Sequence, residues 1–84
     1  MITILYRPNS EHTRAVEDFK SELVRQQVVV RLVNIDSKEG TAIARLYDIA
    51  EYPAVIAHHE DGQTLEHWAG KLPAINDVVY RAHT

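Results

Sequence analysis

Histidine is the residue type in this sequence that most readily does chemistry, because imidazole is the commonest metal ligand and titrates near neutral pH. The 84 residues include five histidines, at His12, His58, His59, His67 and His83. None of their spacings matches a recognised zinc motif. Neighbours on a regular strand point to opposite faces, so His58 and His59 cannot serve one site, whereas His58 and His67 can face each other across a hairpin. His58 and His67 are therefore the candidate metal ligands, and the alternative is that hairpin histidines simply face solvent.

Ser10 and His12 lie close enough in sequence to raise the question of a serine nucleophile with a histidine base. That chemistry needs a third group that orients the base, and an oxyanion hole, and the sequence has neither a nucleophile elbow nor an obvious triad. The chain also has no cysteine, which excludes a thiolate nucleophile, a disulfide and a Cys-ligated metal. We therefore expect no catalytic residue and no cofactor.

Charge and hydropathy exclude two classes of partner. The net charge is -3 and the basic residues are scattered, so nothing in the sequence offers the clustered positive charge that nucleic acid requires. No apolar run approaches the roughly 20 residues needed to cross a bilayer. The first residues lack the basic region and the small-residue cleavage site of a signal peptide. We expect no nucleic acid, no membrane partner and a cytoplasmic location.

Hydrophobic periodicity predicts seven elements in one domain that covers residues 1–84. Strands are predicted at residues 2–6, 28–35, 54–58 and 63–68, the last two joined by a turn at Asp61-Gly62. Helices are predicted from 10 to about 27, from 41 to about 49, and from the residues after Gly70 to about 82. Asn9 or Ser10 is expected to cap the first helix. The order β-α-β-α-β-β-α predicts an α/β fold with a mixed four-stranded sheet flanked by helices.

Local sequence strengthens this pattern. The residues that match the pattern of a known family are Asn34-Ile35-Asp36, Gly40-Thr41-Ala42, Tyr47, Ile49, Tyr52-Pro53, Asp61-Gly62 and Gly70. Together with the element order, they make the whole chain resemble the thioredoxin-like superfamily in its smaller, glutaredoxin-sized form. In that family the proline before the third strand has a cis peptide bond and faces the active site. The resemblance therefore implies a cis bond between Tyr52 and Pro53.

The family's redox groups are missing from this chain. Ser10-Glu11-His12-Thr13 occupies the place of the Cys-x-x-Cys motif. A hydroxyl is too weak an acid and nucleophile to replace the two thiols. Ile4 lies at about the place of the family's buried carboxylate. The resemblance therefore implies a thioredoxin-like domain without thiol-disulfide activity.

A binding surface is what the resemblance leaves. It implies a groove that holds an extended peptide or glutathione, built from Asn9, Ser10, Glu11, His12, Thr13, Tyr52, Pro53, Ala69 and Gly70. We expect a noncatalytic module that binds a protein or a peptide. One alternative is that Ser10 and Thr13 merely start a helix while Pro53 shapes the strand entry. A second is glutathione binding, in which Ser10 hydrogen-bonds a thiolate at the helix N-terminus, although enzymes that do so add a helical domain.

Overall fold

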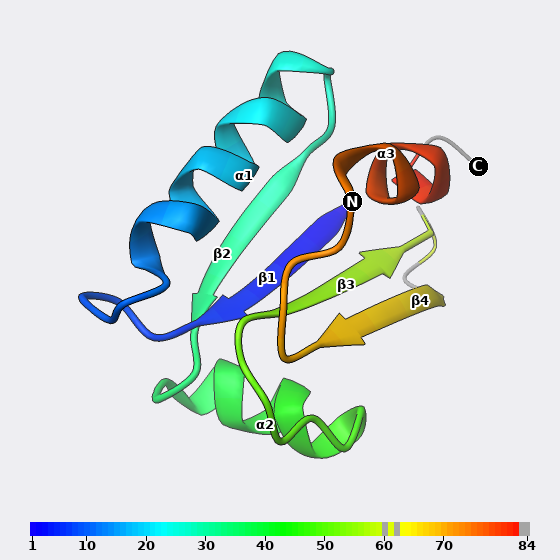
Figure 1. Ribbon diagram of the computed structural model, residues 1–84. Coiled ribbons are helices and arrows are strands. Elements are labelled where there is room, and N and C mark those ends of the chain that lie inside the picture. Colours follow the sequence, from blue (N-terminus) through cyan, green and yellow to red (C-terminus); the bar gives the residue numbers. More distant parts are fainter. Residues whose placement is uncertain (60, 62, 83–84) are drawn as a thin grey trace.

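In the part of the chain that the structure describes, three helices and four strands follow one another in the predicted order β-α-β-α-β-β-α (Figure 1). The computed structural model describes residues 1–59, 61 and 63–82. The elements are β1 (Ile2–Tyr6), α1 (Thr13–Arg25), β2 (Val30–Asn34), α2 (Lys38–Leu46), β3 (Ala54–His58), β4 (Thr64–Ala69) and α3 (Ile75–Ala82). Among the described residues, no helix is both long enough and apolar enough to span a bilayer.

The four strands form one mixed sheet in the order β2-β1-β3-β4. The central strand β1 pairs in parallel with β2, because α1 carries the chain back across the sheet between them, and antiparallel with β3. β3 pairs antiparallel with β4, with an irregularity in the register between Ala57 and His58. The mixed four-stranded sheet predicted from the sequence is confirmed, and β2 and β4 are its edges.

Helices cover both faces of the sheet at its two central strands, which explains why β1 and β3 are mostly apolar. Helices α1 and α3 lie on one side of the sheet and α2 on the other (Figure 1). Successive strand residues point to opposite sides, so Ile2 and Ile4 join the cluster under α1 and α3, while Leu5 joins the cluster under α2. Full burial of each such side chain stabilises the fold by about 1.5–3 kcal/mol.

Several element ends differ from the prediction. α1 begins at Thr13 rather than residue 10, β2 covers 30–34 rather than 28–35, and β4 covers 64–69 rather than 63–68. α3 begins at Ile75, several residues after Gly70. Strand ends follow the hydrogen-bonded ladder rather than the apolar run. Val28, for example, is buried but donates its N–H to the carbonyl of Leu23 at the end of α1, not to a strand.

α2 begins three residues earlier than predicted because Ser37 caps it. The Ser37 hydroxyl accepts the N–H of Gly40 at 2.9 Å and donates to the carbonyl of Asn34 at 2.7 Å. Gly40 therefore lies inside the helix, where glycine normally costs about 1 kcal/mol relative to alanine. Here it is required, since an added Cβ would collide with the backbone carbonyl of Asn34. The close approach of α2 to the end of β2 depends on this glycine.

Thr3 is the one polar residue among the fully buried side chains of the described part. It is 0% exposed in the middle of β1, and its hydroxyl has no hydrogen-bond partner among the described residues. A buried hydroxyl without a partner costs about 1–3 kcal/mol of stability.

Thr3→Val is therefore expected to raise the free energy of unfolding by about 1 kcal/mol, because a methyl group replaces the unpaired hydroxyl at nearly equal volume. Urea unfolding followed by circular dichroism measures this. Thr3→Ser is the matched control, since it keeps the hydroxyl and removes the methyl, and is expected to lower stability by about 1 kcal/mol. A Thr3→Val variant less stable than the parent would contradict this description of the site.

Candidate functional site

Arg7 directly follows β1, and side chains of the next loop bond to its backbone carbonyl. The Ser10 hydroxyl donates to the Arg7 carbonyl at 2.6 Å, and the Thr13 hydroxyl donates to the same oxygen at 3.2 Å. The Thr13 Oγ1 also accepts the N–H of Ser10 at 2.9 Å. The hydroxyls of Ser10 and Thr13 thus hold the loop onto the end of β1.

The backbone N–H of Arg7 is held by His12. It donates to His12 Nε2 at 3.2 Å, so the unprotonated Nε2 of the imidazole is the acceptor. His12 is also the residue that precedes α1, and no side chain caps this helix. The prediction that Asn9 or Ser10 caps α1 is therefore wrong: the Ser10 hydroxyl is used on Arg7, and Asn9 adopts a left-handed turn with φ of 60°, a conformation that asparagine tolerates.

A cavity of about 270 Å³ opens between this loop and Tyr52, and its lining residues are Arg7, Ser10, Glu11, His12, Ile35 and Tyr52. Of the nine predicted groove residues it brings together Ser10, Glu11, His12 and Tyr52. The lining does not include the other five, which are Asn9, Thr13, Pro53, Ala69 and Gly70.

Sequence reasoning missed Arg7 and Ile35 in this lining. Both follow directly on strands, β1 and β2, that run in parallel, so their carboxyl ends meet at the same edge of the sheet. That position was the available signal, because ligands of α/β sheets bind at this edge. The Arg7 guanidinium lies 3.6 Å from the Asp36 carboxylate, and both side chains are exposed.

Pro53 and Gly70 do not line the cavity, but they are hydrogen-bonded to each other next to Tyr52, which does. The Tyr52-Pro53 peptide bond is cis, and Pro53 is buried. The N–H of Gly70 donates to the Pro53 carbonyl at 3.1 Å, just beyond the last pair of the β3·β4 ladder, Ala54 with Ala69. Gly70 has φ of 95°, which favours glycine. These residues fix the backbone on which Tyr52 is carried.

Tyr52 lies where the ladder between β1 and β3 stops. Met1 and His58 exchange two backbone hydrogen bonds, and the alternation of an antiparallel ladder then makes Thr3 with Ile56 and Leu5 with Ala54 the next bonded pairs. Arg7 with Tyr52 would follow. That pair does not form, since the Arg7 N–H is bonded to His12 and its carbonyl to the loop hydroxyls. Within the described residues, the backbone N–H and C=O of Tyr52 have no hydrogen-bond partner.

The two candidate metal ligands lie elsewhere, on the α2 side of the β3-β4 hairpin. The Tyr47 ring centroid is 6.5 Å from that of His58 and 5.9 Å from that of His67. The Tyr47 hydroxyl is hydrogen-bonded to that of Thr64. His58 pairs with Thr64 across the ladder and His67 with Ile56, so the two imidazoles are diagonal rather than opposite neighbours. Over residues 1–59, 61 and 63–82, no group of three metal-ligating side chains comes together.

His59 makes a separate contact in the hairpin turn. His59 lies 3.4 Å from the carboxylate of Asp61 in the hairpin turn, and the position of His83 is outside the described residues.

In comparisons with known proteins, no family model and no curated protein matches the chain. Its function therefore has to be inferred from the geometry of the cavity beside Tyr52.

The loop hydroxyls are expected to act on stability. Ser10→Ala should lower the free energy of unfolding by about 1 kcal/mol, and Thr13→Val by about 1–2 kcal/mol, because Thr13 both donates to Arg7 and accepts from Ser10. The double variant should lose less than the sum, since the two side chains share one acceptor. Glu11→Ala is the neighbouring control, expected within about 0.5 kcal/mol of the parent. A Ser10→Ala variant as stable as Glu11→Ala would refute the role of this hydroxyl.

Proposed function

We propose that the chain is a noncatalytic thioredoxin-like domain that binds an extended protein or peptide segment in the cavity between residues 7–13 and Tyr52. The element order and the mixed sheet in the order β2-β1-β3-β4 support the thioredoxin-like assignment. The absence of cysteine leaves no thiol for thiol-disulfide exchange. The Ser10 hydroxyl, which is the nearest equivalent of a thiol here, donates a hydrogen bond to the backbone carbonyl of Arg7.

The observation that carries the proposal is the interrupted ladder at Tyr52. Its N–H and C=O have no partner within the described residues, although the residue is half-buried and lines the cavity. An extended segment supplies one backbone donor and one backbone acceptor at every residue, so it can pair with both groups. A bound extended segment would thus pair with the backbone of Tyr52, with which Arg7 does not pair. This is the mode of binding known as strand addition.

The size of the cavity favours a peptide over a bulky cofactor. Its volume of about 270 Å³ is slightly below the range of about 300 to 1,000 Å³ that is usual for drug-sized ligands. A cavity of this size accommodates one or two side chains of a segment that continues along the surface. Ile35 and the ring of Tyr52 give it an apolar part, so the bound segment is expected to place an apolar side chain there.

Charge adds a preference for a basic segment. Glu11 is exposed at the cavity and makes no ion pair with any described residue. The arginine in the lining, Arg7, already has Asp36 as its partner. A lysine or arginine of the ligand would therefore meet an unpaired carboxylate, whereas an acidic ligand would meet no unpaired cation among the lining residues.

The test is an NMR titration of the labelled protein with three probes: a cysteine-free peptide of alternating valine and lysine, its valine and glutamate counterpart, and reduced glutathione. We expect the lysine peptide to shift the amides of Ser10, Glu11, His12 and Tyr52, with a weaker response to the glutamate peptide. Shifts caused by glutathione alone would replace the peptide proposal with the thiol-tripeptide alternative. No shift with any probe at millimolar concentration would overturn the binding role.

Glu11→Lys isolates the contribution of charge. It is expected to weaken binding of the lysine peptide about fivefold, which corresponds to about 1 kcal/mol. Asp18→Lys is the matched control, because Asp18 is an exposed carboxylate on α1 outside the cavity lining and its reversal changes the net charge by the same amount. Equal weakening by both variants would show that only the overall charge of the domain matters.

A further inference from the structure

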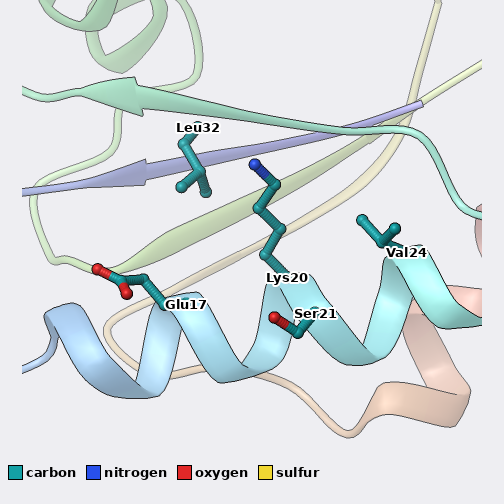
Figure 2. Close-up of a pocket in the computed structure, with 5 residues that line it drawn as sticks. All are labelled: Glu17, Lys20, Ser21, Val24 and Leu32. Carbon is teal, nitrogen blue, oxygen red and sulfur yellow. The ribbon is translucent and has the colours of Figure 1, made fainter.

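A second, larger hollow lies between α1 and the edge strand β2, away from the cavity at Tyr52. Its volume is about 550 Å³, and it is lined by Glu17, Lys20, Ser21 and Val24 from α1 and by Leu32 from β2. Figure 2 shows the Leu32 side chain pointing from the strand toward the helix, and the Lys20 amino group pointing from the helix toward the strand. We call this hollow the edge groove.

The backbone of β2 is open on the side of the edge groove. A parallel ladder uses the backbone groups of every second residue. The bonds from the Ile2 N–H to the Val29 carbonyl and from the Ile35 N–H to the Tyr6 carbonyl show that residues 29, 31, 33 and 35 bond to β1. The N–H and C=O groups of Val30 and Leu32 consequently point away from β1, to the outer edge of the sheet, where another strand can pair with them.

Apolar side chains flank this open edge on both faces of the sheet. Val24 is 52% exposed on the α1 side, and Val29 is 69% exposed just before β2. Leu32 is half-buried in the middle of β2. β2 thus combines free backbone groups with exposed valines beside it and with the exposed Arg31, and exposed apolar patches at a sheet edge mark sites of association.

One anionic and one cationic side chain of α1 line the edge groove. Glu17 and Lys20 both line it, and neither makes an ion pair with any described residue. A surface that carries one unpaired anion and one unpaired cation is complementary to itself, because a two-fold axis brings the cation of one copy toward the anion of the other. A partner of one charge sign would satisfy only one of the two groups.

We propose that the edge groove is the site of homodimerisation, in which β2 pairs antiparallel with β2 of a second copy about a two-fold axis near Leu32. The Leu32 N–H of each copy then donates to the Leu32 carbonyl of the other, and the two sheets join into one. The two leucines meet in the combined groove beside Val24, while Lys20 of each copy reaches toward Glu17 of the other. This surface is separate from the cavity at Tyr52, so the inference does not depend on the proposed peptide binding.

The experiment is sedimentation equilibrium of the full chain from micromolar to millimolar concentration, with charge variants. Glu17→Lys and Lys20→Glu each place like charges across the axis and are expected to weaken dimerisation about tenfold. The double variant Glu17→Lys/Lys20→Glu restores complementary pairs with the original net charge, so its dissociation constant should return to near that of the parent. Asp18→Lys, which lies outside the groove lining, controls for net charge and should leave the dimer unchanged.

Val24→Asp tests the apolar part, and it should abolish the dimer without unfolding the chain because this side chain is largely exposed. Circular dichroism of each variant verifies the fold. A parent that is monomeric at millimolar concentration overturns the proposal, as does a dimer that the double variant fails to restore. A monomer whose Val30 and Leu32 amides shift on addition of an extended peptide also overturns it, and would assign the edge to a different partner.

Discussion

The geometry of the candidate site depends on one constraint, the pairing of the backbone N–H and C=O of Arg7 with side chains. The central strand β1 has partners on both sides, and its ladder to β3 ends when the N–H and C=O of Arg7 turn to His12, Ser10 and Thr13. Three short polar side chains thereby replace a strand as partner. Because side chains take the place of a strand as partners of Arg7, α1 starts at Thr13 and the cavity opens beside Tyr52. The backbone of Tyr52 is then left without a partner among the described residues.

The rest of the fold makes the arrangement rigid. Helices on both faces bury four of the five residues in each of β1 and β3, so the end of β1 cannot move without disturbing two apolar clusters. The parallel pairing of β1 with β2 places Arg7 beside Ile35, and the hydrogen bond from Gly70 to Pro53 fixes the segment that carries Tyr52. Loop residues supply the chemistry of the cavity, while its position is set by the sheet.

The sequence predicts the architecture well and the side-chain partners poorly. The strands at residues 2–6 and 54–58 are predicted to the residue, because continuous β-branched and aliphatic runs indicate strands buried on both faces. The predicted starts of α1 and α2 are wrong for a common reason, because the fold decides which backbone group a serine hydroxyl bonds. Ser10 has the composition of a cap yet donates to Arg7, whereas Ser37 does cap its helix and begins it before a glycine. Arg7 and Ile35 join the cavity through strand pairing, which no local pattern of residues encodes.

Gly40 has a consequence for how freely this chain can vary. Its α-carbon sits against the carbonyl of Asn34, so any of the other nineteen side chains would push α2 away from the end of β2. Its helical neighbours Thr41, Ala42, Arg45 and Leu46 are all exposed. α2 therefore combines a position that tolerates a single amino acid with an outer face open to nearly any. A library of variants on that face can diversify the surface of the domain while the distance between helix and sheet stays fixed.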